Sequence, residues 1–282
     1  MRLGTLRSPS LGTTVAVRID DDDVAVEIPG FADVGALLAV EGWRTVARGA
    51  DGPRHDAVEA GSWAPPVLRP SKIVCVGLNY RNHILEMGRE LPEYPTLFAK
   101  FPEALVGPFD PIVLPAHASD AVDWEAEVAV VIGATARRVP EHEAGAVIAG
   151  FAVLNDVTMR DYQYRTTQWF QGKTFEATTP FGPWLTVSED GTPPGGASEM
   201  RTEIDGEVMQ RTPVDDMVFG PAALVSYVSH VITLHPGDVI ATGTPGGVGH
   251  ARTPARYLEP GQVLVTSVSG LGELRNEIVA ED

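Results

Sequence analysis

The stretch "VDWEAEVAVVIG", residues 122–133, decides the fold. Its second half is apolar and β-branched, which is typical of a buried strand. Glu125 and Glu127 lie two residues apart in it, so on a strand both carboxylates project from the same face. Two like charges side by side repel, and burying either of them alone is costly. The pattern therefore predicts a positively charged group between the two glutamates.

Composition and charge narrow the class of protein. The chain has 282 residues, of which 44% are hydrophobic, so it can form one large domain or a main domain with a small partner. A formal net charge of -17 disfavours nucleic acid and anionic membranes, because both attract basic surfaces. Cys75 is the only cysteine, which favours a reducing compartment. Since we find neither a signal peptide nor an apolar run of about 20 residues, we expect a cytoplasmic protein with no membrane contact.

The order of predicted elements indicates a β-rich α+β fold. A proline-rich segment, residues 63–72, is typical of an extended linker, and we place a small N-terminal α/β domain at 1–68 and the main domain at 69–282. Residues 79–90 are expected to form a helix. Short strands then recur between Pro and Gly turns, which favours this class over a doubly wound parallel sheet. These strands include "WEAEVAVVIG", "GFAVLND", "GPWLTVS", "RTEIDGEVMQR", "GDVIATG" and "QVLVTSVSG".

A third carboxylate follows another apolar run, "GFAVLND", which ends at Asp156. If a helix begins there, Asp156, Arg160 and Gln163 share one of its faces. Three carboxylates without clustered His or Cys form an oxygen-only ligand set, which favours Mg²⁺ or Mn²⁺, or else Ca²⁺, over Zn²⁺. Two simpler interpretations stay open at this point: a helix salt bridge between Asp156 and Arg160, and a charged edge strand carrying the two glutamates.

A candidate acid–base pair lies in "GLNYRNHILEMG", residues 77–88. His83 and Glu86 are three residues apart, so on a helix their side chains can touch. A carboxylate beside an imidazole orients the ring and supports its charged form, the usual arrangement for a general base acting on water. The spacing alone is equally typical of a partly buried histidine with an ordinary helical contact.

Two further segments offer polar groups in apolar surroundings. Lys173 stands among aromatic residues, where a lysine can bind an anionic substrate or stabilise an enolate, or else lay its stem along an apolar surface. The glycine-rich segment 237–249 lacks the spacing of a dinucleotide fingerprint. It either holds Thr242 and Thr244 toward a ligand or forms a plain hairpin.

Taken in order, these segments resemble the fumarylacetoacetate hydrolase family in its smaller, two-part bacterial form. The resemblance covers residues 72–278 and implies a mixed β-roll fold and a homodimer. It implies a divalent metal at Glu125, Glu127 and Asp156. It also implies a catalytic dyad of His83 and Glu86 and a catalytic lysine, Lys173. The residues that would contact the substrate are Arg160, Gln163 and Thr244. The motifs that carry it are "GLNYRNHILEMG", "PTLFAKFPEALVGP", "DWEAEVAVVIG", "GFAVLNDVTMRD", "QGKTFEATTPFGPW" and "GDVIATGTPGGVG".

The sequence departs from the larger members of this family in one respect. They supply a fourth carboxylate from an N-terminal segment, whereas here only Glu90 and Glu93 follow the His–Glu pair, and neither can be assigned as a ligand. We therefore expect water in that position, as in the smaller members.

The resemblance implies chemistry on a small 2-oxo or diketo acid through a metal-stabilised enolate. The leading prediction is hydrolysis of a C–C bond in an acylpyruvate-like or 2,4-diketo acid. His83, held by Glu86, would deprotonate a water that attacks the distal carbonyl, and Lys173 would stabilise the departing pyruvate enolate. The first alternative is a decarboxylase or isomerase, as in homoprotocatechuate-type aromatic catabolism. The second is a non-catalytic ligand-binding relative, which would need no base.

Overall fold

The computed structural model describes residues 1–8, 12–86, 88, 90–118, 120–193 and 198–281. Its centre is a large mixed sheet, in which twelve strands pair among the described residues. In the order of pairing the strands are β4 (Arg54–His55), β3 (Ala25–Glu27), β2 (Thr13–Ile19), β1 (Arg2–Ser8), β14 (Thr179–Val187), β12 (Ile148–Asn155), β11 (Ala126–Ile132), β17 (Val239–Ala241), β6 (Ile73–Gly77) and β7 (Thr96–Lys100), with β5 (Trp63–Ala64) on β1 and β8 (Leu105–Val106) on β14.

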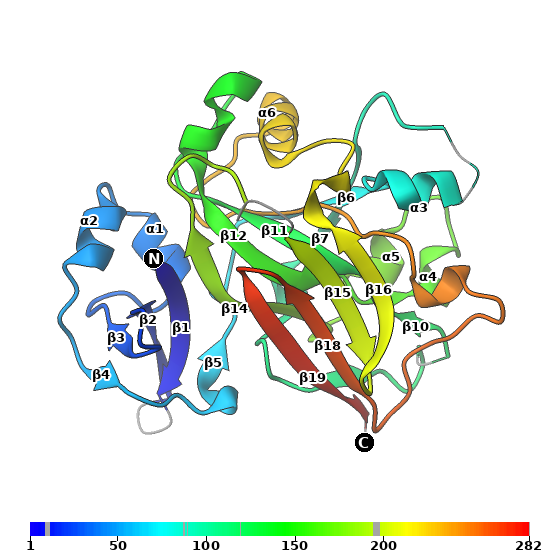
Figure 1. The fold of residues 1–282 in the computed structure, drawn as a ribbon, viewed down its shortest axis with the longest axis horizontal. Helices are drawn as coiled ribbons and strands as arrows, with labels where there is room; N and C mark the ends of the chain where they lie inside the picture. The colour runs from blue at the N-terminus through cyan, green and yellow to red at the C-terminus, as the bar shows by residue number, and fades with distance from the viewer. Residues whose placement is uncertain (9–11, 87, 89, 119, 194–197, 282) are drawn as a thin grey trace.

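A second sheet lies over the middle of the first one (Figure 1). Its strands, in the order of pairing, are β16 (Glu207–Pro213), β15 (Glu199–Ile204), β18 (Val263–Val268), β19 (Gly272–Ala280) and β9 (Ile112–Leu114). The β15–β16 hairpin turns at Asp205 and Gly206, both with positive φ, as a tight Asp-Gly hairpin turn requires. A separate short pair joins β10 (Val122–Asp123) to β13 (Thr158–Met159).

Helices are few and short in the described part of the chain. The α-helices are α1 (Val34–Leu38), α2 (Trp43–Arg48), α3 (Arg81–Glu86), α4 (Arg160–Gln163), α5 (Phe170–Lys173) and α6 (Pro221–Val231). The 3₁₀ turns are η1 (Ala60–Ser62), η2 (Pro102–Ala104), η3 (Glu141–Val147), η4 (Val214–Asp216) and η5 (Gly249–Ala251). The β-rich α+β prediction is confirmed. The helix expected over 79–90 is shorter in the described residues, where it covers α3.

The core lies on both faces of β11, whose seven residues are all buried. Val128 and Val130 belong to a cluster with residues of the second sheet and α6. Ala129 and Val131 belong to a cluster with residues of α1 and α2. Burial on both faces explains why this strand is apolar at nearly every position instead of alternating. The charged exception, Glu127, lies at the end where β11 begins.

The N-terminal part continues the large sheet. Strand β1 pairs with β14, where Leu3 lies opposite Leu185. In the segment 63–72, expected to be a linker, Trp63 forms part of β5 and Val67 is buried in the core beside α1. The boundary at residue 68 stays a prediction, and the two parts it separates share one sheet.

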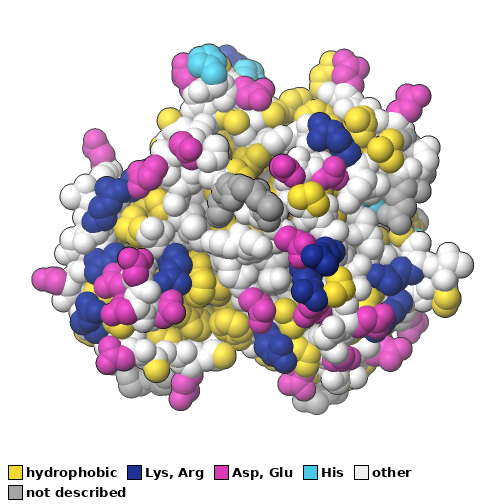
Figure 2. Space-filling model, viewed as in Figure 1, with side chains coloured by type: hydrophobic (Ala, Val, Ile, Leu, Met, Phe, Trp, Pro, Cys, Tyr) yellow, Lys and Arg dark blue, Asp and Glu magenta, His cyan; other side chains and the backbone are white. Residues whose placement is uncertain are grey.

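Two observations bear on larger partners. In the described residues, none of the helices has the length and apolar character needed to cross a membrane. On the face shown in Figure 2, acidic and basic side chains are interspersed, and the described residues form no broad basic patch there.

Candidate active site

Three carboxylates converge where β11 begins and β12 ends. Glu125 precedes β11, Glu127 is its second residue, and Asp156 directly follows β12. The pairing of Ala126 with Asn155 sets this register, and the Asp156 N–H donates to the Glu125 carbonyl at 2.8 Å. One oxygen from each carboxylate lies within 4.8 Å of one from each of the other two, and all three side chains are buried. The expected same-face placement of the two glutamates brings both carboxylates to Asp156.

Two buried lysines pair with two members of this carboxylate triad, Glu125 and Asp156. The Lys173 ammonium lies 2.5 Å from Glu125 Oε2 and 2.8 Å from Asp156 Oδ2. The Lys100 ammonium lies 2.5 Å from the other oxygen, Asp156 Oδ1. Burial alone raises the pKa of Asp156, but the two lysines outweigh it and hold the pKa below its usual value. Burial alone lowers the pKa of Lys173, but Asp156 and Glu125 reverse this, so the pKa is raised and the side chain stays a cation.

Arg160 has different partners from those expected. Its guanidinium pairs with Asp123 Oδ2 at 2.7 Å and with Glu125 Oε1 at 2.8 Å, and its Nη1 donates to Gln163 Oε1 at 2.9 Å. The prediction that Asp156, Arg160 and Gln163 share one helix face is wrong. The reason is that residues 158–159 are extended, paired with β10 as β13, and the helix begins only at Arg160.

Glu127 is the member of the triad that lacks a cation. Among the described residues, the Gly243 N–H donates to Glu127 Oε2 at 2.8 Å, and no lysine or arginine pairs with it. Burial raises the pKa of Glu127 well above its usual value, and the neighbouring Asp156 and Glu125 raise it further. The expected positive group therefore reaches Glu125 but not Glu127. A buried, oxygen-only donor set with one carboxylate left unbalanced fits a hard divalent cation.

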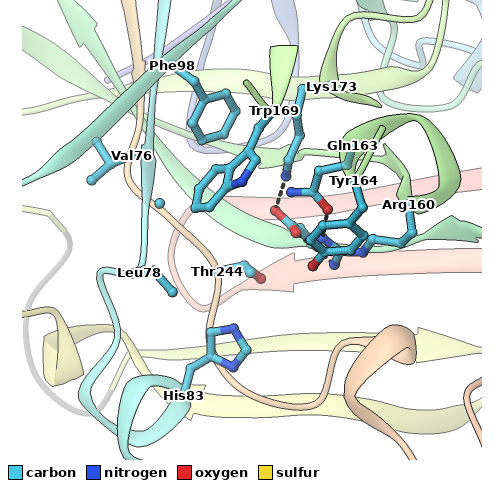
Figure 3. A pocket seen from close by; sticks show the side chains of 12 residues that line it. Val76, Leu78, His83, Phe98, Arg160, Gln163, Tyr164, Trp169, Lys173 and Thr244 are labelled. Carbon is cyan, nitrogen blue, oxygen red and sulfur yellow. Dashed lines mark hydrogen bonds and ion pairs between the residues drawn. The ribbon is translucent and has the colours of Figure 1, made fainter. Parts of the chain in front are cut away.

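One member of the triad, Glu125, lines a pocket of about 170 Å³ (Figure 3). Lys173, Gln163 and Arg160 lie on one side of it, and His83 lies on the opposite side, on α3. Trp169 and Phe98 form an aromatic wall, with their ring centroids 5.7 Å apart. The indole packs closely on β6, because a side chain at Gly77 would meet it at 2.3 Å. The pocket is therefore narrow, apolar at one end and charged at the other.

His83 reaches the pocket through a constrained turn. Leu78, also in the pocket lining, has a φ of 57°, a strained conformation for a leucine. The next residue, Asn79, is buried and donates to the carbonyls of Thr242 at 2.8 Å and Phe219 at 3.0 Å. It thereby ties the start of α3 to the loop after β17. The side chain of Glu86 lies outside the described residues, so the His–Glu dyad stays a prediction.

Comparison with known proteins identifies the family. Residues 72–279 match the family model "Fumarylacetoacetate (FAA) hydrolase C-terminal". The chain belongs to the fumarylacetoacetate hydrolase family. The predicted resemblance is thus confirmed, over nearly the same residues as expected from the motifs.

Relatives in this family carry several names. The chain is 43% identical over 216 residues to the bovine mitochondrial oxaloacetate tautomerase FAHD2A, covering 76% of this chain and 68% of that protein. It is similar in structure to a fumarylacetoacetate hydrolase from Exiguobacterium antarcticum, with a TM-score of 0.87, 31% identity and full coverage of both chains. It is also similar to a 5-carboxymethyl-2-hydroxymuconate delta-isomerase from Mycobacterium smegmatis, with a TM-score of 0.80, 36% identity and full coverage of both.

The family membership supports part of the functional prediction. The chain is a member of an enzyme family whose members include isomerases and hydrolases and usually bind a divalent metal. The specific role of hydrolase, the identity of the metal and the cytoplasmic location stay predictions. Neither Glu90 nor Glu93 belongs to the acidic cluster found among the described residues.

Sequence reasoning missed three side chains that build the site. Lys100 could have been found, because it lies two residues after Phe98 in β7 and the two side chains therefore project from the same face. Asp123 lies in the stretch 122–133, but its spacing indicated no role, although it pairs with Arg160. Gln210 gave no local signal, because it arrives from β16 in the second sheet and contacts β11 only through the tertiary fold.

Proposed function

We propose that this family member binds Mg²⁺ or Mn²⁺ at Glu125, Glu127 and Asp156 and converts a small 2-oxo acid to its enol or enolate. The observation that carries the proposal is the buried carboxylate triad, whose Glu125 lines the pocket together with its ion-pair partner Lys173. When bound, the metal would act as a Lewis acid toward the 2-oxo group. Ca²⁺ suits the same oxygen ligands, so the metal has to be identified by measurement.

The chain's own residues divide the remaining work. Lys173, kept protonated by two carboxylates, is a hydrogen-bond donor for the oxygen on which negative charge develops. We assign to His83, which lies across the pocket, the transfer of a proton from the substrate carbon and back to it. Arg160, Gln163 and Thr244 line the pocket around these groups, and we assign them to binding of the substrate carboxylate.

The reaction that we favour is keto–enol tautomerisation of a four-carbon 2-oxo dicarboxylic acid. In the direction of the enol, His83 takes a proton from C3 while Lys173 donates a hydrogen bond to the carbonyl oxygen. The enolate oxygen then takes up a proton from solvent, and His83 releases its proton to solvent. In the reverse direction the enol oxygen loses its proton to solvent and protonated His83 gives a proton to C3. Two observations support this choice over the leading prediction from sequence: relatives more than 40% identical are named oxaloacetate tautomerases, and the pocket beside Trp169 and Phe98 is small, about 170 Å³.

The second candidate is hydrolysis of a C–C bond in an acylpyruvate. It is favoured by the likeness to a fumarylacetoacetate hydrolase over the full chain, and by the position of His83, from which it could activate a water. Decarboxylation of a β-keto acid uses the same enolate and stays a further branch. A ligand-binding relative without activity would leave the buried lysine and the histidine without a chemical role.

A panel of 2-oxo acids tests the proposal. Oxaloacetate is followed by the decay of its enol absorbance, acetylpyruvate by the release of acetate and pyruvate, and both by CO₂ release, each with Mg²⁺, Mn²⁺, Ca²⁺ or a chelator. We expect metal-dependent tautomerisation that is faster than the uncatalysed rate and is lost on chelation. Acetate release would move the assignment to the hydrolase. Metal-independent turnover, or none with any member of the panel, would overturn the proposal.

A further inference from the structure

Gln210 is a buried amide that uses both of its ends fully. Its Oε1 accepts from the Ala126 N–H at 3.1 Å and from the Thr202 hydroxyl at 2.8 Å. Its Nε2 donates to the Pro245 carbonyl at 3.1 Å and to Thr244 Oγ1 at 2.8 Å. The residue thus joins the second sheet, the loop after β17, and the strand residue that separates Glu125 from Glu127.

The orientation of this amide is determined by its backbone partners. A backbone N–H can only donate and a backbone carbonyl can only accept, so Oε1 must face Ala126 and the NH₂ group must face Pro245. The inverted amide would place two donors together at Ala126 and two acceptors together at Pro245. Gln210 therefore always presents a hydrogen, and never a lone pair, to Thr244 Oγ1.

This orientation decides what Thr244 can offer to the pocket. A hydroxyl has one hydrogen, and an oxygen that already accepts from Gln210 keeps that hydrogen for another partner. Thr244 is 8% exposed and belongs to the pocket lining. Among the described residues, no other hydrogen bond to its hydroxyl is present. By contrast, the nearby Thr242 donates its hydroxyl hydrogen to the Val128 carbonyl at 2.9 Å and does not line the pocket.

Gln210 also completes the hydrogen bonding of β11 at Ala126, the residue between Glu125 and Glu127. On the side of β11 that pairs with β17, the Thr242 N–H donates to the Val128 carbonyl at 3.0 Å. The next residue facing that side is Ala126, whose N–H donates to Gln210, since none of the described strands pairs with it there. One side chain therefore fixes both the backbone between the two glutamates and the hydroxyl of Thr244.

We propose that Gln210 is a positioning residue that makes Thr244 a dedicated hydrogen-bond donor for an anionic oxygen of the substrate. The inference rests on the proposed function, in which a 2-oxo acid binds in this pocket. It adds to it a specificity rule: at the Thr244 corner the pocket takes a carboxylate, which only accepts hydrogen bonds, and disfavours a group that needs an acceptor there.

The substitution Gln210→Glu tests this rule with almost no change of shape. The amide brings two hydrogens, one for Pro245 and one for Thr244, whereas a carboxylic acid brings one and a carboxylate none. The remaining hydrogen is needed at the Pro245 carbonyl, so the new oxygen presents a lone pair to Thr244. The Thr244 hydroxyl then turns to donate to residue 210 and is lost to the ligand. Gln210→Met, which removes all four hydrogen bonds, leaves the Thr244 hydrogen free.

The probe is oxalate with Mg²⁺, because oxalate is a dianion with the O–C–C–O arrangement of a 2-oxo acid enolate. Calorimetry gives its Kd for the wild type, Gln210→Glu, Gln210→Met, Thr244→Val and the Gln210→Glu/Thr244→Val double variant. Losing one hydrogen bond to a charged group should weaken binding roughly 10- to 100-fold in Gln210→Glu and Thr244→Val. The double variant should be no worse than Thr244→Val alone, since Gln210 acts through that hydroxyl. Gln210→Met should lose less affinity for oxalate than Gln210→Glu. Mg²⁺ binding without oxalate should change little in Gln210→Glu and Thr244→Val, because both keep an acceptor for the Ala126 N–H.

Each outcome has a definite meaning. A purely structural role predicts the opposite order, with Gln210→Met worse than Gln210→Glu, or additive effects in the double variant, and either result would overturn the inference. Gln262→Glu, a substitution before β18 that is not in the pocket lining, controls for the added carboxyl group. If Gln210→Glu does not fold, Gln210→Met still decides, because a loss as large as that in Thr244→Val contradicts the rule. If the wild type shows no Mg²⁺-dependent oxalate binding, the proposed function fails first and the inference fails with it.

Discussion

The substitution Glu127→Gln should reverse the usual effect of removing a buried charge. Glu127 is buried, and among the described residues its one hydrogen bond is donated by the Gly243 N–H. The side-chain oxygen of a glutamine can accept this hydrogen bond equally well. The substitution keeps the volume and this hydrogen bond and removes only the negative charge. We expect the metal-free variant to be at least as stable as the metal-free wild type, and to have lost most of its affinity for Mg²⁺.

The separation within the triad sets the size of both effects. Carboxylate oxygens within 4.8 Å of one another repel by about 3 kcal/mol per charged pair at an effective dielectric constant of about 20. Lys173 and Lys100 offset part of this repulsion, and the raised pKa of Glu127 lets the buried carboxylate take up a proton instead. We therefore expect a gain of roughly 1–2 kcal/mol at most for the metal-free variant. Mg²⁺ at about 100 times its Kd stabilises the wild type by about 2.7 kcal/mol, and by only about 0.4 kcal/mol if the affinity falls about 100-fold.

Thermal unfolding with and without Mg²⁺ measures both terms. The wild type should gain roughly 5 °C or more from Mg²⁺, whereas the Glu127→Gln protein should gain about 1 °C. The order of the two unfolding temperatures should therefore reverse. Without metal, that of the variant is equal to or higher than that of the wild type, and with metal that of the wild type is higher. Glu259→Gln, at an exposed carboxylate after η5, is the matched control and should behave like the wild type in both conditions.

Two results would refute the reasoning. A Glu127→Gln protein that keeps the full Mg²⁺-dependent shift would show that Glu127 is not a ligand. A metal-free variant several degrees less stable than the metal-free wild type would show that the charge is already balanced, which contradicts the absence of a paired cation among the described residues.

Three further predictions follow from the same geometry. His83→Ala should slow metal-dependent turnover roughly 10²- to 10⁴-fold while calorimetric Mg²⁺ binding persists, and unchanged turnover would place the base elsewhere. Lys100→Met leaves the buried carboxylate of Asp156 with one lysine instead of two, so denaturant unfolding without metal should show a loss of about 3–5 kcal/mol, and a loss below 1 kcal/mol would contradict the buried pair. The exposed apolar residues Val231 and Ile232 at the end of α6 add to the family's expectation of a homodimer, so light scattering should give about twice the chain mass of 30.1 kDa, and 30.1 kDa across micromolar concentrations would refute it.

Sequence could predict those parts of the site that local periodicity controls. Glu125 and Glu127 obey the two-residue repeat of a strand, so their common face follows from their spacing alone. Asp156 ends an apolar run, which predicts that its carboxylate lies at the end of a strand. The run does not predict which other strand lies beside it. Its place next to Glu125 depends on the register of β12 against β11, which is set by packing across the whole sheet.

The parts that could not be predicted depend on contacts between distant segments. Arg160 has the helical spacing to reach Asp156, yet a two-residue strand between them redirects it to Asp123 and Glu125. Gln210 lies 84 residues from Ala126 in the sequence, and nothing in its own neighbourhood indicates that it completes a strand of another sheet. Such side chains become visible only when each buried donor and acceptor is assigned a partner.

The charges around the pocket argue for an anionic ligand as well as a metal. With every group ionised, the four carboxylates outnumber the three basic side chains by one. A divalent cation turns this excess of one negative charge into an excess of one positive charge, which a buried site should compensate. A carboxylate from the substrate restores neutrality, so metal and acid should each raise the affinity for the other. The groups concerned are Asp123, Glu125, Glu127, Asp156, Lys100, Arg160 and Lys173.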